Sequence, residues 1–386
     1  MAERKAPRGV ERRLEHEGTL VRMGGGLAAG LPGLLTEAGI GAGRVLVVAD
    51  AFLVGRRALD VVLDALKGAG IAAETAPGIA GEPKAATVDG LAGRARTFGA
   101  EALVAVGGGS TLDAAKLAAA VAVRGRAIDY ALCASPLPAD ALPVAALPTT
   151  AGTGSEVTRT SVVSDASGRK LWAWGDGLRP RLAVLDPSLT ASLPPDLTLW
   201  TALDALSHAI EAATHARRTD RAVAAALEAA AMIVASLERV LDDLADLGGR
   251  ADLLWGSMQA GRAIDLAGCT APHALAHALG SLRPAHHGRL VALAHDALMA
   301  PNVEAAPGLF ASVAGAVGTD AEGLPGWFSD LLARTRLDRG FGGEGLGAGA
   351  VVAAMLTPEH RPMLAANPKS YSTDELERLV APLLAA

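Results

Sequence analysis

The chain of 386 residues is long enough for two domains of ordinary size, each with its own hydrophobic core. Hydrophobic residues make up 51% of the sequence, but no stretch of about twenty apolar residues lacks a charge, which argues against a membrane span. The net charge of −6 argues against a general nucleic-acid surface, so the expected partners are small molecules.

The N-terminal segment and the cysteines indicate the compartment. Residues 1–18 are charged throughout and contain no apolar run, which argues against a secretory signal, and the basic first dozen residues are expected to form a solvated arm. Cys133 and Cys269 lie far apart in the sequence and fit free thiols in a reducing environment. We therefore expect a cytoplasmic protein without a disulfide.

The first apolar run that predicts a buried parallel strand is RVLVVA, residues 44–49. It is followed by Asp50. An acidic side chain at the carboxyl end of such a strand can accept hydrogen bonds from a ribose diol and would repel a 2′-phosphate, which favours NAD over NADP. A turn or cap role for Asp50 is the structural alternative.

A second apolar run, residues 101–106, leads into a glycine turn and an alanine-rich helix. The turn consists of Gly107, Gly108 and Gly109. We predict that Ser110 caps a helix that runs from about Thr111 to Val123. Glycines let the main chain approach a pyrophosphate closely, and the N–H groups at the positive end of a helix bind negative charge. A glycine run alone is equally consistent with an ordinary turn. The phosphate-binding interpretation therefore depends on the strand before the glycines and the helix after them.

A third predicted strand, Val144–Leu147, leads into the loop PTTAGTGSEVT. The loop carries the hydroxyl groups of Thr149, Thr150, Thr153, Ser155 and Thr158. Together with main-chain amides, these hydroxyl groups suit the ribose and the amide of a nicotinamide nucleotide. A plain Ser/Thr loop is the alternative.

The sequence pattern changes near Asp186-Pro187. Before this point apolar runs alternate with Ala/Leu helices, which is typical of parallel βαβ units, and after it almost everything has helical periodicity. We therefore predict an α/β plus all-α fold. A Rossmann-like parallel-sheet nucleotide domain would occupy residues 1–187, and an all-helical metal and substrate domain would occupy residues 188–386.

One carboxylate and several imidazoles form a candidate ligand set for a divalent metal. Two pairs are spaced four residues apart, Asp204 with His208 and His273 with His277, so each pair can point at one ion from successive helical turns. Pro284 disfavours an unbroken helix, so His287 is expected to return to the cluster beyond a loop. Carboxylate and imidazole suit Fe²⁺ or Zn²⁺ better than Ca²⁺. A single histidine is more often a surface or core residue than a ligand, but the clustering favours the metal.

The motifs GGGSTLDAAK, PTTAGTGSEVT, DALSHAIEA and HALAHALGSLRPAHHG occur in this order. In this combination the chain resembles the iron-dependent (group III) alcohol dehydrogenases, whose wider superfamily includes glycerol dehydrogenase and dehydroquinate synthase. The resemblance runs from about residue 50 to residue 302, with a weaker echo in NPKSYSTDEL near the C-terminus.

The resemblance implies roles for the matching residues. The metal ligands would be Asp204, His208, His273 and His287, and His277 would lie beside the substrate as the proton carrier. The turn from Gly107 to Ser110 would hold the pyrophosphate, Asp50 would bind the adenosine ribose, and Asp113 would lie near the nicotinamide. The rest of the cofactor groove would be lined by Thr149, Thr153, Thr158, Thr160 and Lys170. The implied cofactors are NAD(H) and one divalent metal, Fe²⁺ rather than Zn²⁺, and the implied assembly is a homodimer.

We therefore predict a metal-dependent, NAD(H)-linked oxidoreductase that transfers a hydride between the nicotinamide and a small alcohol or its aldehyde or ketone. The Ala/Gly-rich composition suggests a role in specialised biosynthesis. One alternative is oxidation of a β-hydroxy acid, including a peptide C-terminal threonine, followed by decarboxylation. Another is a cyclase or lyase of the dehydroquinate synthase type, although those enzymes carry Glu where this chain has Asp204. A non-catalytic relative would be expected to lose ligands, and all four positions are intact.

Departures from the family pattern concern the substrate. Asp265 stands where relatives often carry Asn, and His295 and Asp296 stand where apolar residues are common. Arg159, Arg283 and His295 could bind an anionic group of the substrate, although structural roles are favoured for all three.

Overall fold

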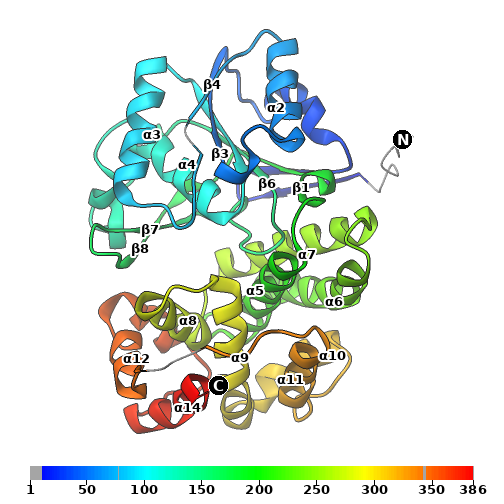
Figure 1. The fold of residues 1–386 in the computed structure, drawn as a ribbon, viewed down its shortest axis with the longest axis vertical. Coiled ribbons are helices and arrows are strands. Elements are labelled where there is room, and N and C mark those ends of the chain that lie inside the picture. Colours follow the sequence, from blue (N-terminus) through cyan, green and yellow to red (C-terminus); the bar gives the residue numbers. More distant parts are fainter. Residues whose placement is uncertain (1–10, 77, 342–344, 386) are drawn as a thin grey trace. The chain divides into compact units, whose positions relative to one another are not determined.

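The computed structural model describes residues 11–76, 78–341 and 345–385 (Figure 1). The solvated arm expected at the N-terminus falls mostly on residues 1–10, outside this range. The contacts divide the chain into two compact units. One ends at Leu193 and also includes Leu244–Trp255, and the other comprises Pro194–Asp243 and the chain from Gly256 onward.

Within the described residues, the first unit contains a seven-stranded sheet in the order β1-β2-β9-β6-β5-β3-β4. The strands are β1 (Arg12–His16), β2 (Thr19–Met23), β3 (Arg44–Ala49), β4 (Ala72–Thr75), β5 (Ala102–Gly107), β6 (Val144–Pro148) and β9 (Leu182–Leu185). β1 pairs antiparallel with β2, and the other pairings in this sheet are parallel. A separate antiparallel hairpin consists of β7 (Thr160–Ser164) and β8 (Lys170–Trp174).

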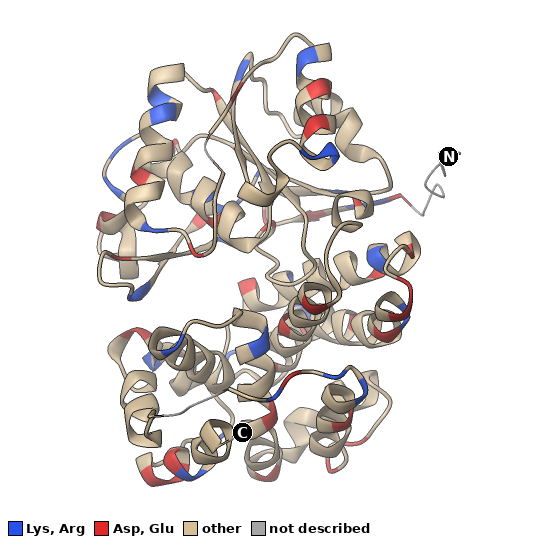
Figure 2. Ribbon diagram, viewed as in Figure 1, with Lys and Arg blue, Asp and Glu red and all other residues tan. Residues whose placement is uncertain are grey.

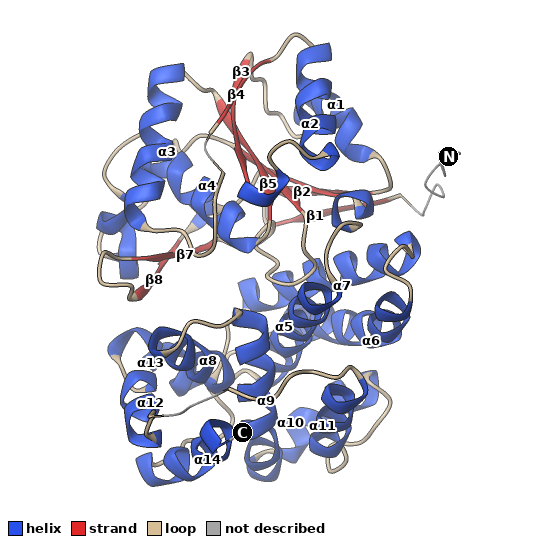
Figure 3. Cartoon of the chain, in the orientation of Figure 1, coloured by secondary structure: helices blue, strands red, loops and turns tan. Residues whose placement is uncertain are grey.

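Helices bury both faces of this sheet (Figure 3). The helices that lie wholly in the unit are α1 (Leu31–Glu37), α2 (Arg57–Gly68), α3 (Ala85–Phe98) and α4 (Gly109–Val121). Alternate residues of β3 belong to different cores: Leu46 packs with α3 and α4, whereas Val45 and Val47 pack with α1 and α2. A parallel strand that is covered on both faces has no polar side, which explains the continuous apolar runs in the sequence.

The strand order reverses at β3, because the chain proceeds from β3 to β4 on one side and then to β5 on the other. At the carboxyl ends of these strands the main chain of Asp50 donates a hydrogen bond to Val106 (3.0 Å), and that of Thr149 donates to Gly107 (3.0 Å). The segments that follow β3, β5 and β6 therefore begin side by side. In open α/β sheets such a reversal is where ligands bind.

The second unit is helical, and most residues of α5 are buried. Its helices are α5 (Pro195–Thr214), α6 (Asp220–Asp242), α7 (Leu247–Leu266, from Gly256 onward), α8 (Ala271–Leu282), α9 (His287–Ala305), α10 (Pro307–Ala316), α11 (Leu324–Arg334), α12 (Ala348–Met355), α13 (Arg361–Ala366) and α14 (Thr373–Ala385). Short 3-10 helices are η1 (Leu27–Gly30), η2 (Ala51–Leu53), η3 (Ala127–Cys133), η4 (Asp176–Leu178) and η5 (Pro187–Thr190) in the first unit and η6 (Pro358–His360) in the second. α5 packs mainly against α6 and α9, and α8 packs against α9.

Acidic and basic residues share the same helices (Figure 2). On α2, for example, Arg57 and Lys67 flank Asp60 and Asp64. In the part of the chain that the structure describes, no helix combines the length and the apolar character needed to cross a membrane.

The predicted cap of α4 is wrong. The helix begins at Gly109 with Gly108 as its N-cap residue, so Ser110 lies inside the first turn, and no side chain caps this end among the described residues. The physical reason is the glycine turn itself. Its extended N-cap residue leads the chain from β5 directly into the helix, two residues before the position predicted from the sequence.

Close packing of α5 against α9 depends on Gly288. A Cβ atom at this position would overlap the main-chain carbonyl of Trp200 and lie 3.1 Å from Cβ of Asp204. Gly288 directly follows His287, so the same contact determines how closely that histidine approaches α5.

We predict that Gly288→Ala lowers the free energy of unfolding by about 1–3 kcal/mol, because the added methyl group forces α9 away from a rigid carbonyl. Thermal unfolding followed by circular dichroism measures this. The control is Gly308→Ala on α10, where a Cβ atom meets nothing within 4 Å, so no loss of stability is expected. Equal melting temperatures for the two variants would contradict the packing argument.

Candidate functional site

The N-terminus of α4 is the first candidate site, in the first unit. Residues 108–110 are partly exposed, and no side chain within the described ranges caps this end of the helix. The first N–H groups of a helix have no partner within it and carry partial positive charge. This end of α4 can therefore hold a phosphate group.

The glycines of this turn are required by packing. A Cβ atom on Gly109 would lie 2.5 Å from Cγ2 of Thr153, and one on Gly107 would lie 2.6 Å from Oγ1 of Thr111. Thr150 lies 3.4 Å from the corresponding position on Gly108. The Thr-rich loop after β6 therefore packs directly on the glycine turn, which brings Thr150 and Thr153 to it.

Asp50 lies beside this turn. Its main chain bonds to Val106, the residue before Gly107, and its carboxylate accepts a hydrogen bond from the main-chain N–H of Phe52 (2.8 Å). Asp50 thus caps η2, which is the cap role named as the alternative to ribose binding. It also occupies the strand-end position expected of a residue that binds a ribose. One carboxylate can serve both purposes, because each of its oxygens has two acceptor positions.

A buried lysine holds the loop against α4. Nζ of Lys116, which is 0% exposed, donates hydrogen bonds to the main-chain oxygen (3.0 Å) and Oγ (2.8 Å) of Ser155 and lies 3.4 Å from Oγ1 of Thr158. Asp113 forms an ion pair with Lys116 (3.2 Å) and accepts hydrogen bonds from Ser155 and from the main chain of Val162. The structure therefore places Asp113 in a network that shapes the loop. Nothing in the sequence pattern had singled out Lys116.

The β7–β8 hairpin separates two of the predicted cofactor residues. Thr160 pairs with Trp174 at one end, whereas Lys170 pairs with Ser164 at the other and forms an ion pair with Glu82 (3.0 Å). Thr160 and Lys170 therefore lie at opposite ends of the hairpin. The remaining loop threonine, Thr149, is buried beside Gly107.

The second candidate site is a buried cluster in the second unit, and it contains all four predicted ligands. The Nε2 atoms of His208, His273 and His287 lie 3.8, 3.5 and 3.9 Å from one atom, Oδ1 of Asp204. Asp204 and His208 come from successive turns of α5, His273 from α8, and His287 from the first residue of α9, after the loop that contains Pro284.

The cluster fits a cation. Oδ1 of Asp204 and Nε2 of His273 are buried and have no hydrogen-bond partner among the described residues. Ligand atoms that surround one tetrahedral ion at about 2.0 Å lie about 3.3 Å apart. The three distances to Asp204, 3.5 to 3.9 Å, are slightly longer than that spacing, and a carboxylate with imidazoles is a donor set for Fe²⁺ or Zn²⁺.

Glu211, which was not among the predicted site residues, orients His273. Its Oε1 lies 2.5 Å from Nδ1 of His273, so Nε2 is the nitrogen that faces Asp204. Burial would raise the pKa of Glu211, but His273 and His295 outweigh it and hold that pKa well below its usual range. Burial would likewise lower the pKa of His273, but Glu211 and Asp204 raise it to about 10. The signal in the sequence was the spacing Asp204, His208, Glu211, which places all three on one face of α5.

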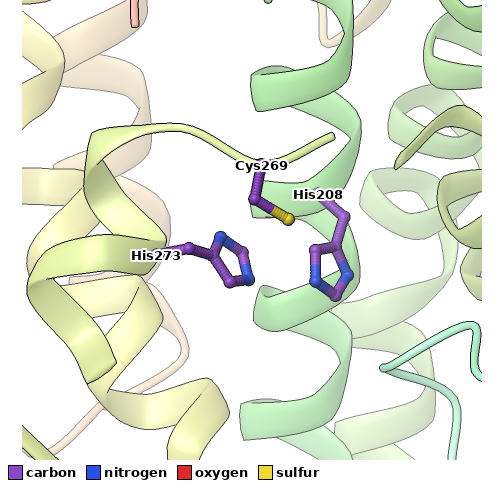
Figure 4. A group of neighbouring side chains, drawn as sticks. All are labelled: His208, Cys269 and His273. Carbon is purple, nitrogen blue, oxygen red and sulfur yellow. The ribbon is translucent and has the colours of Figure 1, made fainter. Parts of the chain in front are cut away.

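The same carboxylate fixes the start of α8. Thr270 donates hydrogen bonds to Oε2 of Glu211 from its main-chain N (2.5 Å) and its Oγ1 (2.9 Å). The preceding residue, Cys269, lies between α7 and α8, and its sulfur points toward the imidazoles of His208 and His273 (Figure 4). Both cysteines of the chain are free.

His277 lies one turn after His273 on α8. Its ring centroid is 5.2 Å from that of His287 and 6.3 Å from that of His273. On its other side the ring of His360 lies 5.5 Å away. His277 is therefore next to the cluster and partly exposed, in reach of a molecule bound there.

Two of the three residues considered for an anionic substrate group, Arg159 and His295, are engaged elsewhere, whereas Arg283 is exposed. His295 is buried, with Nδ1 3.8 Å from Oε1 of Glu211. Arg159 stacks on the ring of Trp174 (4.2 Å) and bonds to Asp176 (3.1 Å). Structural roles explain both residues.

Comparison with known proteins decides the family. The family model described as "Iron-containing alcohol dehydrogenase" matches residues 19–187, and the one described as "Fe-containing alcohol dehydrogenase family, C-terminal" matches residues 198–381. The chain belongs to this family. As a member of the iron-containing alcohol dehydrogenases it is a metal-dependent, NAD-linked alcohol oxidoreductase, as its motifs predicted.

Individual known proteins are similar to this chain over most of their length. A probable alcohol dehydrogenase, EutG of Escherichia coli, is 32% identical over 342 residues, 88% of this chain and 87% of EutG. A choline dehydrogenase of Bacillus subtilis is 32% identical over 76% of this chain and 77% of its own. The crystal structure of sulfoacetaldehyde reductase from Bifidobacterium kashiwanohense in complex with NAD⁺ is 28% identical, with a TM-score of 0.89 over 97% of this chain and 99% of that one.

Glu156, in the Thr-rich loop of this dehydrogenase, is a buried acid outside both clusters. It is 2% exposed, and its Oε1 has no hydrogen-bond partner among the described residues. Burial raises the pKa of Glu156 from 4.5 to about 7, against the smaller opposing effect of Lys116. Between pH 4.5 and about 7, the folded protein therefore keeps a proton on Glu156 that the unfolded chain has already released.

We predict that Glu156 lowers the stability of the protein progressively as the pH rises from 4.5 to about 7, by up to about 3 kcal/mol. Glu156→Gln removes the titrating group but keeps the shape of the side chain. Relative to the wild type, the variant should gain stability between pH 5 and pH 8, measured by urea unfolding at both values. A difference between the two proteins that does not change with pH would refute the assignment.

Proposed function

We propose that this chain binds NAD(H) at the carboxyl ends of β3 and β5, holds one divalent cation at Asp204, His208, His273 and His287, and interconverts a small alcohol with its aldehyde or ketone. The observation that carries the proposal is the convergence of three imidazole nitrogens on one buried carboxylate oxygen. A buried carboxylate oxygen without a hydrogen bond is costly, and a cation would compensate it.

The bound cation would polarise the oxygen of the alcohol or carbonyl group, and the nicotinamide would accept or supply the hydride. The protein residues position these partners. Glu211 fixes the orientation of His273 and keeps its Nε2 directed at Asp204. His277 is the proposed proton carrier, since it lies beside the ligands without converging on Asp204.

The cofactor residues are proposed on the geometry of the first unit. The N-terminus of α4, from Gly107 to Ser110, would bind the pyrophosphate through main-chain N–H groups. Asp50, next to it, would accept hydrogen bonds from the adenosine ribose and repel a 2′-phosphate, so NAD is favoured over NADP. The residues proposed to line the groove further along are Asp113, Thr149, Thr150, Thr153, Thr158, Thr160 and Lys170.

The finer assignments follow the relatives. We propose Fe²⁺ rather than Zn²⁺ as the resident ion, on the description of the family. The relatives named above point to small polar alcohols or aldehydes as substrates. A homodimer in the cytoplasm is the proposed assembly and location, and the two free cysteines agree with a reducing compartment.

The proposed function is tested with the purified protein loaded with Fe²⁺ or Zn²⁺. We expect bound metal by elemental analysis and metal-dependent oxidation of NADH by short-chain aldehydes. His277→Ala should keep its metal and its NADH affinity while kcat falls by about 10²–10⁴-fold, because only proton transfer is removed. Asp204→Ala should lose the metal. Metal loss in His277→Ala, or full metal occupancy in Asp204→Ala, would show that the roles are misassigned.

A separate prediction concerns Glu211. Glu211→Gln should weaken metal binding by about 10–100-fold, because a neutral amide no longer fixes the tautomer of His273. Competition titration with a chromophoric chelator measures the affinity. The control is Glu238→Gln on α6, whose carboxylate pairs with Arg334 at the surface and which should bind metal like the wild type. Equal affinities in both variants would exclude the orienting role.

A further inference from the structure

Cys269 lies within the metal cluster although its sequence position gives no indication of a ligand. Its Sγ and one ring nitrogen each of His208 and His273 all lie within 4.8 Å of one another. Figure 4 shows the sulfur from the α7–α8 connection and the two imidazoles, from α5 and α8, turned toward the same space. The two rings are stacked, with centroids 4.6 Å apart and an angle of 16° between their planes.

The main chain holds Cys269 in this position from both sides. Gly268 before it adopts φ +113°, a conformation that side chains rarely allow, and a Cβ atom there would lie 3.1 Å from Nε2 of His215. Thr270 after it is bonded twice to Glu211. The cysteine is therefore fixed by the same carboxylate that orients His273.

A second observation points to a cation at this place. Nδ1 of His273 is occupied by Glu211, and its remaining nitrogen, Nε2, is buried without a hydrogen-bond partner among the described residues. His273 is 3% exposed. It belongs to two sets of potential ligands, one with Asp204 and His287 and one with His208 and Cys269. His273 is the residue that the two sets share.

We propose that Cys269 coordinates the bound cation as a thiolate, together with His208 and His273, and so raises the affinity of the site for thiophilic divalent ions such as Co²⁺ and Zn²⁺. The inference rests on the proposed metal centre and adds a ligand to it. Thiolate ligands favour these ions over Mn²⁺, which prefers oxygen and nitrogen donors. On binding, the thiol proton is released to solvent and the sulfur lone pair forms the bond to the metal.

The test is Co²⁺ titration of the intact metal-free protein, followed by absorbance. A thiolate ligand gives an intense near-ultraviolet charge-transfer band, which imidazole and carboxylate ligands do not give. We expect this band in the wild type and in Cys133→Ser, a control that removes the exposed cysteine of the first unit. Cys269→Ala and Cys269→Ser should still bind Co²⁺ but lack the band. Their Co²⁺ affinity should fall by about tenfold or more, with Mn²⁺ affinity changed by less than about threefold.

The outcomes separate this inference from the metal centre itself. Co²⁺ bound to the wild type without the band, or a band that persists in Cys269→Ala, would overturn the thiolate ligand and leave the four-ligand site standing. No Co²⁺ binding by the wild type would overturn both. X-ray absorption at the zinc edge is an independent readout that uses only the wild type, and we expect one sulfur neighbour at about 2.3 Å.

Discussion

The second unit is organised around two carboxylates buried on one helix. Asp204 and Glu211 lie seven residues apart on the same face of α5 and are 2% and 1% exposed. An uncompensated buried carboxylate costs several kcal/mol, so the surrounding elements must supply positive charge or hydrogen-bond donors. His273 meets both requirements, with Nδ1 on Glu211 and Nε2 toward Asp204. The start of α8, through Thr270, and the first residue of α9, His287, likewise supply hydrogen-bond donors or an imidazole to these two carboxylates.

The first unit differs from the second, because its proposed ligand, NAD(H), is expected to be bound largely by main-chain groups. There the buried charge is Lys116, whose ammonium is enclosed by Asp113, Ser155 and Thr158. Its contacts hold the Thr-rich loop on α4, and the loop in turn packs on Gly109. Each unit therefore contains a buried charged residue, Lys116 in the first and Glu211 in the second, that does not face the proposed ligand. This residue holds in place the neighbouring residues that do face the ligand. Such residues determine the precision of a site as much as the groups that touch a substrate.

The sequence predicted three of the buried parallel strands, but not the fourth, β9, whose four apolar residues make too short a run. The apolar runs that became β3, β5 and β6 are covered on both faces, so they contain no polar positions to confuse the pattern. β1, β2 and β4 were not predicted, because β1 carries arginine and glutamate at exposed positions, β2 carries Arg22, and β4 is only four residues long. Their strand conformation follows from pairing with a neighbour, which a local pattern does not contain. The β7–β8 hairpin was missed for the same reason.

Helical spacing predicted which residues of the cluster share a face, but it does not distinguish a ligand from its neighbour one turn away. His273 and His277 have equal claims by periodicity, and only packing against α5 directs Nε2 of His273 at Asp204. Glu211 was within reach of the same argument, as the next residue on that face. Cys269 was not, because it lies between helices. Its direction is set by Gly268, which has a positive φ, and by two hydrogen bonds that the neighbouring Thr270 donates to Glu211 on α5. Ligands on helices can thus be read from spacing, whereas a ligand on a connection depends on tertiary contacts that exist only once α5 and α8 have packed.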